Sequence, residues 1–290
     1  MTENIAFAQE VLRDLNRKVR GGNIVLKLDL EKAYDMVDWE FLKQVLRKFS
    51  FYYRWITLME RCWGNSWFSI LIIAEVVGFF KSSRGLHQGD PLSLGLFILT
   101  ADAFSRSFKF MMVRGWSQLF QIRRGFPLAS HLLFMDGTLS FLNGSRASIL
   151  RVKALLNEFQ AASGQRINLS KTSFICLDKL PAGRIISIER VLGINRCTAR
   201  ICYLGVPLSM GRIKSSDFQF LLDKVDHKIS RWKVGHLSQA GKATLIHHIL
   251  SSIPLHVMAT GIVPTQVISK LERSFARFFW GWADGRQKLH

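Results

Sequence analysis

Acidic residues are scarce in this chain of 290 residues, where 21 Asp and Glu stand against 40 Lys and Arg and leave a formal net charge of +19. Apolar residues are not scarce: 48% of the chain is hydrophobic, with 22 Phe and 8 Trp. That composition argues against a disordered tail protein and predicts one large domain or two to three subdomains. A folded chain with this excess of cations usually meets a polyanion, nucleic acid first and a membrane surface second. A merely soluble basic protein is the third interpretation.

Cysteines and long apolar runs are also few. The four cysteines are Cys62, Cys176, Cys197 and Cys202. None forms a CxxC pair or has a His at zinc-finger spacing, so we expect reduced, mostly buried thiols of an intracellular protein. Residues 1–20 contain acids and no apolar segment of the kind found in signal peptides. The longest apolar run, 67–80, includes Glu75 and is too short to cross a membrane, so no membrane association is expected.

Hydrophobic periodicity predicts a mixed α/β body of about 210 residues followed by helices only. The predicted helices are 3–18, 41–49, 92–104, 150–159, 242–250 and 267–279, with a further helical pattern from 218 to 232. The predicted strand regions are 23–30, 68–80, 131–141, 167–176 and 201–208. Asp38 and Asp90 are expected to cap their helices, with Pro91 as a first helical residue.

Two acids stand at the ends of buried strands. Asp29 closes the run NIVLKL, and Asp136 interrupts HLLFMDGTLSF, residues 131–141. A carboxylate there is costly unless a Lys, an Arg or a metal ion pairs with it. Two such acids on adjacent strands could share two Mg²⁺ ions, which prefer oxygen ligands and assist displacement at phosphorus. The alternative for Asp136 is structural: Asp-Gly between apolar residues predicts a type I′ turn with positive φ at Asp136 and Gly137.

Five stretches of the sequence follow one another in the order of a known set of motifs. They are KLDLEKAYDMVDWEFL (27–42), SSRGLHQGDPLSLGLF (82–97), SHLLFMDGTLSF (130–141), SGQRINLSKTSF (163–174) and CYLGVPL (202–208). Together they resemble the successive motifs of LINE-type reverse transcriptases, the non-LTR class abundant in plant genomes. The tail at 232–258 is similar to the segment that follows the polymerase core in plant elements. Five ordered motifs argue against coincidence in a generic basic α/β protein.

The resemblance implies the α+β fold of a right-hand polymerase, with an antiparallel-sheet palm, partial fingers and a helical thumb. Partial fingers and palm are expected in 1–212, and the thumb with a post-polymerase extension in 213–290. The implied activity is RNA-directed DNA polymerisation with two Mg²⁺ ions. The implied partners are an RNA template, a DNA primer, their hybrid and dNTP, in the nucleus or cytoplasm. The sequence makes no prediction about oligomeric state.

The resemblance also implies catalytic roles for individual residues. Asp29 and Asp136 match the metal-binding aspartates, and the backbone carbonyl of Leu30 would face a metal ion as well. Lys171 matches the lysine that protonates the pyrophosphate leaving group; its alternative is an exposed lysine at the end of a strand.

Further residues match substrate contacts. Tyr34 matches the aromatic that rejects a 2′-OH, with a core aromatic as the alternative. Gln88 and Gly89 match the loop that positions nucleotide and template; a glycine turn before a capped helix is the alternative. The residues that resemble the primer grip are Tyr203, Leu204 and Gly205. The cations that could contact phosphates, or be solvated charges, are Arg17, Lys18, Arg20 and Arg84.

The sequence departs from the family pattern at the hairpin tip. The family carries two adjacent aspartates after an alanine, whereas this chain reads Met135-Asp136-Gly137. The glycine suits a turn but removes a carboxylate, at a cost of about 10²–10³ in rate or more by analogy with other single electrostatic groups. Leu94 replaces a usual proline, and Ser140 a usual apolar residue.

The chain is also expected to be truncated, since it starts just before the first aspartate motif, with most of the fingers missing. We also expect no endonuclease domain before the first motif and no zinc-knuckle or RNase-H-like region after the last. We therefore expect weak or no polymerase activity. The second hypothesis is a non-catalytic, nucleic-acid-binding remnant of the same fold.

Overall fold

The computed structural model describes residues 2–118, 120–123, 129–177, 180–198, 202–208, 214–232, 237–261 and 263–281. Contacts divide the chain into two compact units. The sheet unit is Asp14–Thr198; the helical unit joins Met1–Arg13 to Ala199–His290. The first helix and residues 202–208 thus group with the C-terminal helices. The functional division into partial fingers, palm and thumb stays a prediction.

The sheet unit is built around one long strand, β1 (Asn23–Glu31). On one side β1 pairs with β5 (Gly137–Asn143), which in turn pairs with β4 (His131–Phe134). On the other side it pairs with β6 (Arg166–Ile167) and β7 (Ser173–Cys176). Every pairing is antiparallel, and the predicted strand at 23–30 and hairpin at 131–141 are confirmed.

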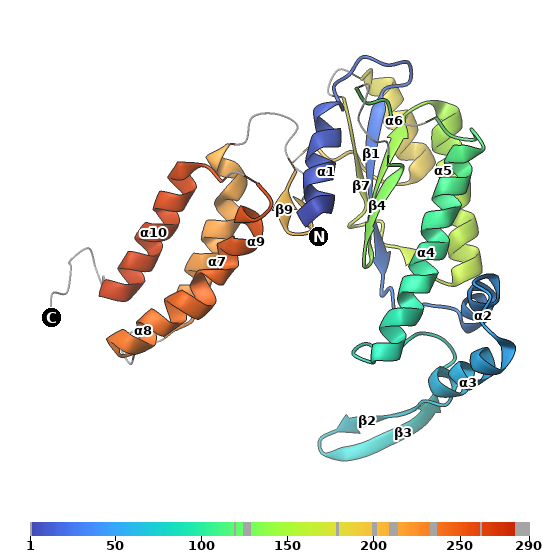
Figure 1. Cartoon of the computed structure of the whole chain (residues 1–290), viewed down its shortest axis with the longest axis horizontal. Helices are drawn as coiled ribbons and strands as arrows, with labels where there is room; N and C mark the ends of the chain where they lie inside the picture. Colours follow the sequence, from blue (N-terminus) through green and yellow to red (C-terminus); the bar gives the residue numbers. More distant parts are fainter. Residues whose placement is uncertain are drawn as a thin grey trace. The chain divides into compact units, whose positions relative to one another are not determined.

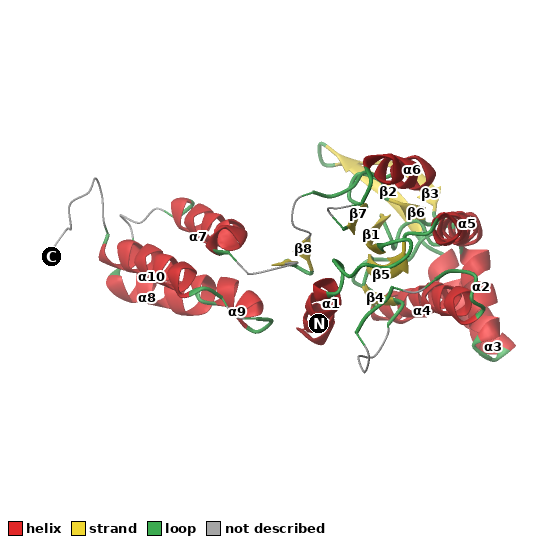
Figure 2. Cartoon of the chain, turned by 90° about the horizontal axis from the view of Figure 1, so that it is seen from above, coloured by secondary structure: helices red, strands yellow, loops and turns green. Residues whose placement is uncertain are grey.

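Helices cover one face of this sheet (Figures 1 and 2). They are α4 (Pro91–Val113), α5 (Arg146–Ser163) and α6 (Ala182–Leu192). Ile24, Leu26 and Leu28 pack into the apolar core beneath them, because alternate residues of a strand share a face. The helices contribute Phe104, Phe108, Val152, Leu156, Ile188 and Leu192. Helices on one face of an antiparallel sheet are the α+β arrangement that the sequence predicted.

A second core lies between α2 (Trp39–Lys48), α3 (Tyr53–Gly64) and the start of α4. Its buried residues are Ala33, Val37, Leu42, Leu46, Ile56, Trp63, Leu86, Leu96 and Phe97. Both predicted caps are confirmed: the Asp38 carboxylate accepts from the Phe41 N–H, and that of Asp90 from the N–H groups of the first turn of α4. Helices α3 and α6 were not predicted.

The β-rich region at 68–80 is a hairpin of β2 (Trp67–Ile72) and β3 (Glu75–Lys81). The two strands pair only with each other within the described residues, and every residue in them is exposed. The sequence predicted the strands and gave no sign of this exposure.

The helical unit contains short strands and helices. Its elements are α1 (Thr2–Arg13), β8 (Cys202–Tyr203), β9 (Val206–Pro207), η1 (Ser215–Phe218), α7 (Gln219–Ser230), α8 (Gln239–Leu245), η3 (Ile246–Leu250), α9 (Ser252–Met258) and α10 (Thr265–Trp280). The predicted helix at 3–18 ends early, at Arg13, and the one predicted at 242–250 finishes as a π-helical turn, η3. No helix in the described ranges combines the length and apolarity needed to cross a bilayer.

The expectation of mostly buried cysteines is wrong. Only Cys176 is buried; Cys197 is partly exposed, and Cys62 and Cys202 are exposed. Cys62 and Cys202 lie on α3 and β8, elements with few buried positions of their own.

Candidate functional site

The ladder beside β1 is interrupted at Asp29. Strand β6 ends at Ile167 and β7 begins at Ser173, so residues 168–172 leave the sheet. The Asp29 N–H donates to Thr172 Oγ1 at 3.2 Å, and the Asp29 carbonyl accepts from the Asn168 N–H at 2.9 Å. Interruptions of this kind re-aim side chains next to functional sites, and here the loop fixes the backbone that carries the first acid.

The second acid stands in the two-residue loop of the β4–β5 hairpin. Phe134 pairs with Gly137, so the loop residues are Met135 and Asp136. Only Met135 has a positive φ, +51°. The predicted type I′ turn over Asp136 and Gly137 is therefore wrong: Gly137 is the first residue of β5, where it pairs with Asp29. The Leu30 N–H donates to the Asp136 carbonyl at 3.3 Å, which ties the tip to β1.

The two carboxylates lie close enough to affect each other. Burial raises the pKa of the Asp29 carboxyl; the Lys171 ammonium opposes this effect, and the Asp136 carboxylate adds to it. Lys171 Nζ lies 4.0 Å from Asp29 Oδ1, and the Asp29 side chain is 19% exposed. Asp29 thus has the lysine partner that the sequence offered as one alternative, and Asp136 as a neighbour.

A cavity of about 320 Å³ opens beside these acids. Its lining residues are Leu30, Glu31, Lys32, Ala33, Tyr34, Gln88, Met135, Asp136, Asn168 and Lys171. Five predicted site residues therefore share one pocket although they come from four separate stretches of sequence. Asp29 does not line the cavity but adjoins it through Leu30 and Lys171.

Tyr34 and Gln88 reach the pocket because two segments are held together. The Tyr34 ring stacks on Phe97 of α4, with centroids 4.3 Å apart, and the Tyr34 carbonyl accepts from the Leu86 N–H at 2.9 Å. Gly85 has φ +92°, and a Cβ added to it would meet the Asp35 carbonyl oxygen at 2.6 Å. Only glycine allows this close approach, which brings Gln88 to the pocket wall.

Two other predicted residues on this segment do not line the pocket. Gly89, with φ +91°, directly precedes the capping residue Asp90, which is the turn that the alternative interpretation described. Arg84 is exposed, and its carbonyl accepts from the Ser82 hydroxyl at 2.7 Å.

The residues that resemble the primer grip belong to the helical unit. Leu204 and Gly205, with φ +51° and +78°, form the tight turn between β8 and β9. The His256 ring Nε2 and the Leu204 carbonyl oxygen are 2.8 Å apart. Tyr203 is buried, and burial raises its pKa to about 12.

Comparison with known proteins decides what family this site belongs to. Residues 2–221 match the family described as reverse transcriptase (RNA-dependent DNA polymerase). The chain belongs to that family. Membership confirms the predicted fold class, an α+β, right-hand polymerase domain, and the coarse prediction of a reverse transcriptase. Families of this kind generally use divalent metal ions.

The chain spans only part of the length of the curated relatives it matches, between 14% and 52%. It is 26% identical over 265 residues to an uncharacterised 149 kDa protein of the transposon TX1 of Xenopus laevis, covering 88% of this chain and 19% of that protein. It is 40% identical over 63 residues to an uncharacterised mitochondrial protein of Arabidopsis thaliana, 22% of this chain and 52% of that protein. A match to an Arabidopsis protein named for ribonuclease H is 33% identical, covering 29% of this chain and 14% of that protein.

Solved structures with a similar arrangement include two telomerases. The apo telomerase of Candida tropicalis is 15% identical, with 96% of this chain and 50% of that chain covered and a TM-score of 0.48. The telomerase of Candida albicans with a fragment of telomeric RNA is 12% identical, with 97% and 46% covered and a TM-score of 0.46.

Two residues of the candidate site were not predicted. Thr172 and Asn168 bond the backbone of Asp29, and Asn168 Oδ1 also accepts from the N–H groups of Ser170 and Lys171, at 3.1 and 3.2 Å. This turn fixes the backbone of Lys171. The signal was present, because an Asn that begins a short polar loop between two strands is typical of such side-chain turns.

The donor set of this reverse transcriptase domain suits a hard cation. Across the described ranges, no three or more His, Cys, Asp or Glu side chains gather closely enough to bind a metal by themselves. Asp29 and Asp136 are neighbouring carboxylates, and Glu31 also lines the pocket. Mg²⁺ is usually held by one or two carboxylates together with waters and substrate phosphates. The pair therefore fits Mg²⁺ that arrives with a nucleotide rather than a site built from protein alone.

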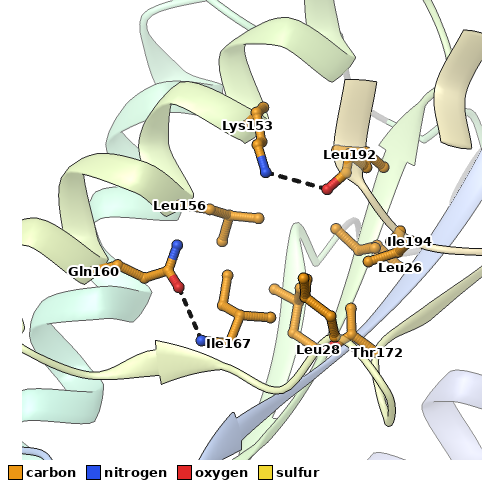
Figure 3. Close-up of a pocket in the computed structure, with 10 residues that line it drawn as sticks. Leu26, Leu28, Lys153, Leu156, Gln160, Ile167, Thr172, Leu192 and Ile194 are labelled. Carbon is orange, nitrogen blue, oxygen red and sulfur yellow. Dashed lines mark hydrogen bonds between the residues drawn. The ribbon is translucent and has the colours of Figure 1, made fainter. Parts of the chain in front are cut away.

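A second cavity, of about 120 Å³, lies behind the sheet on its helix-covered face (Figure 3). Leu26, Leu28, Leu156 and Ile167 supply apolar walls, and Thr172, the partner of the Asp29 N–H, reaches it from the loop. At its edge, Lys153 Nζ donates to the Leu192 carbonyl. With no carboxylate in its lining, this cavity does not suit a metal ion.

Proposed function

We propose that the chain is the reverse transcriptase domain of a plant LINE-type, non-LTR retroelement. One observation carries the proposal: Tyr34, Gln88, Asp136 and Lys171 line a single pocket beside Asp29. These are the positions at which the sequence resembles the catalytic motifs of that class. Two relatives come from Arabidopsis thaliana and one from a transposon, which also supports this origin.

The proposed reaction is nucleotidyl transfer from a dNTP to the 3′-hydroxyl of a DNA primer on an RNA template. Asp29 and Asp136, with the Leu30 carbonyl, would hold two Mg²⁺ ions, which supply positive charge to the attacking and leaving oxygens. Lys171 would donate a proton to the departing pyrophosphate. In the structure its ammonium lies 4.0 Å from Asp29, so it partly neutralises that carboxylate before substrate is present.

The other site residues would select and orient substrates. The Tyr34 ring, held against Phe97, would leave no room for a ribose 2′-hydroxyl. Gln88 and Gly89 would position nucleotide and template, with Arg84 as a phosphate contact. The turn at 203–205 would contact the primer end.

We further propose that polymerisation is impaired at Gly137. This residue is the cross-strand partner of Asp29, and residues directly opposite each other project to the same face of a sheet. An aspartate at this position would therefore add a third carboxylate beside Asp29. The glycine is not needed by the backbone, because its φ is not positive and an added Cβ would meet only the Phe134 carbonyl oxygen, at 3.6 Å.

Primer extension on poly-rA/oligo-dT with Mg²⁺ tests both parts. The chain is compared with Gly137→Asp, with Gly137→Asn as a control of equal size without charge, and with Gly137→Asp combined with Asp29→Asn. We expect Gly137→Asp to extend the primer about 10²-fold faster than the unmodified chain. Gly137→Asn should give no gain, and Asp29→Asn should abolish the gain.

The alternative is a non-catalytic remnant that binds nucleic acid, and the missing carboxylate at Gly137 favours it. In that case neither the chain nor Gly137→Asp extends a primer, while both bind the RNA–DNA hybrid with an affinity that falls steeply as salt rises. If the unmodified chain already extends at the rate of Gly137→Asp, the proposed impairment is wrong. If no variant extends or binds, the reverse transcriptase assignment of this pocket is wrong.

A further inference from the structure

Five cations gather at the end of the sheet that lies away from the catalytic pocket. Three come from the loop that leads into β1, one from the start of α5 and one from α6. We call this set the distal basic surface; it consists of Arg17, Lys18, Arg20, Arg146 and Arg184. All five belong to the sheet unit, and Figure 1 shows the loop before β1 and helix α6 at the same end of the sheet.

The three segments meet at the end of β5. The side-chain amide of Asn143 donates to the Arg20 carbonyl at 2.9 Å, and the Gly144 N–H donates to the Gly22 carbonyl at 2.7 Å. The Arg184 guanidinium donates to the Gly144 carbonyl at 2.8 Å. Arg146 and Arg184 then line one cavity of about 200 Å³ between α5 and α6. The backbone around Gly144 therefore joins the loop at Arg20 to the segments that carry Arg146 and Arg184, and Arg17 and Lys18 precede Arg20 on the same loop.

This positive charge has no acidic ion-pair partner in the parts of the chain that the structure describes. Among the described residues none of the five is ion-paired, and all but Arg184 are exposed. The nearest acids along these segments are engaged elsewhere: Asp14 accepts from the Arg123 N–H and Glu189 from the Arg196 N–H. Like charges held together in this way favour a polyanion as their partner.

The distal basic surface is separate from the catalytic pocket. Asn23 begins β1 near the surface, and Asp29 lies six residues further along the same strand. At a rise of ~3.3 Å per residue the two ends are about 20 Å apart. That span corresponds to roughly six phosphates along one strand of nucleic acid. A phosphate in the pocket cannot also lie on the distal basic surface.

We propose that the distal basic surface is a second nucleic-acid-binding site, which holds the phosphate backbone of an RNA or DNA strand. Arginine forks match phosphate oxygens in pairs. The cavity under Arg146 and Arg184 has apolar walls from Ile149, Ile188 and Val191, and could receive one sugar or base. Nucleic acid is favoured over an anionic membrane because the chain belongs to a family that works on nucleic acid. The site needs no polymerase activity, so it goes beyond the proposed function.

Binding of a fluorescent 20-nucleotide single-stranded RNA between 50 and 200 mM salt tests the proposal. One variant replaces Arg17, Lys18 and Arg20 by Ala; another carries Arg146→Gln with Arg184→Gln. The control removes the same charge elsewhere in the sheet unit by replacing Lys48, Arg54 and Lys109, all exposed, with Ala. Circular dichroism melting checks that each variant is folded.

We expect the variant with three loop substitutions to weaken RNA binding about tenfold or more. It should also reduce the slope of log affinity against log salt concentration by about 2, because each lost phosphate contact contributes ~0.7 to that slope. The double variant should act in the same direction, and the control should change binding by less than about twofold. The three loop substitutions should weaken binding by the same factor in a chain that also carries Lys171→Ala in the catalytic pocket, because the effects of substitutions at distant sites are additive.

Three results would overturn the proposal. Equal losses in the control and the loop variant would mean that only net charge matters. Unchanged RNA binding in both surface variants would mean that no site exists there. If the variants lose binding to vesicles containing phosphatidylserine but keep RNA binding, the surface serves a membrane instead.

Discussion

The two hairpins of the sheet unit are both rich in apolar residues but have opposite surroundings. Both turn through a two-residue loop with a non-glycine residue at positive φ, Met135 in one and Ile73 with Ala74 in the other. In the β4–β5 hairpin, residues 138–143 are all buried, since β5 pairs with the central strand. In the β2–β3 hairpin every residue is exposed.

The difference shows what a third strand contributes. An isolated two-stranded hairpin is marginal in water, and independent stability needs further strands or a covering helix. The β2–β3 hairpin relies on its own aromatic pairs, with the rings of Trp67 and Phe79 4.8 Å apart and those of Phe68 and Phe80 5.9 Å apart. Both hairpins thus consist of apolar-rich strands, and pairing with β1 is what places β5 in the core.

Matched phenylalanine truncations should separate the two hairpins most strongly. Phe141 in β5 is fully buried, and Phe79 in β3 is 75% exposed. Phe141→Ala should lower the free energy of unfolding by about 3–5 kcal/mol, because it leaves a cavity. Phe79→Ala should cost less than about 1 kcal/mol. Urea denaturation followed by tryptophan fluorescence measures both; an equal cost would mean that the β2–β3 hairpin is covered in solution.

The buried hairpin should also carry a pH dependence that the exposed one lacks. Burial, with Lys109 as a smaller cause, lowers the pKa of His131 on β4 from 6.5 to about 4. The folded state favours the neutral form of His131, so the free energy of unfolding has its full value above pH 6.5, where the unfolded chain is also neutral at this residue. The free energy of unfolding decreases as the pH falls from 6.5 towards about 4, because the unfolded chain binds a proton that the folded chain does not.

This difference in pKa corresponds to roughly 3 kcal/mol of unfolding free energy. His131→Gln, which can keep contacts with Ser105 and Ser130, should flatten the profile between pH 6.5 and 4 in urea titrations. A profile unchanged by the substitution would mean that His131 already takes up a proton in the folded chain.

Local signals in the sequence predicted much of the sheet unit. The caps at Asp38 and Asp90 were predictable because a capping side chain bonds N–H groups only two or three residues away. Helix α6 was missed because it has no side-chain cap and carries Gly183 in its first turn. Helix α3 was missed although Trp55, Ile56 and Met59 recur at helical spacing; it begins without a side-chain cap.

The sequence singled out the two acids of the candidate site but not the residues that bond the Asp29 backbone. Asp29 and Asp136 stood out because charge at the end of an apolar strand is unusual. Thr172 and Asn168 reach Asp29 only because the chain leaves the sheet between β6 and β7, a tertiary event. The turn was placed one residue late because the pairing of Gly137 with Asp29 outweighed the local preference of Asp-Gly for a turn.

Removing the buried hydroxyl of the β4–β5 hairpin should give a smaller effect of opposite sign. Ser140 in β5 is fully buried, and its Oγ has no hydrogen-bond partner among the described residues. Because an unsatisfied buried hydroxyl is destabilising, Ser140→Ala should raise the free energy of unfolding by about 1 kcal/mol. Ser69→Ala in exposed β2 is the matched control and should change nothing measurable. A loss of stability in Ser140→Ala would reveal a partner for the hydroxyl, such as a bound water.

The smallest expected effect comes from the loops themselves. Met135 and Ala74 have φ of +51° and +65°, a conformation that costs non-glycine residues about 1–2 kcal/mol. Glycine removes this cost but gives the unfolded chain more freedom, so each substitution by Gly should gain a few tenths of a kcal/mol.

The two gains should appear in different measurements. Met135→Gly acts on a hairpin joined to β1 and should raise global stability in urea. Ala74→Gly acts on a ribbon that opens by itself, so it should slow amide hydrogen exchange within β2 and β3 and leave the urea midpoint unchanged. A shift of the urea midpoint with Ala74→Gly would show that the exposed β2–β3 hairpin unfolds cooperatively with the core.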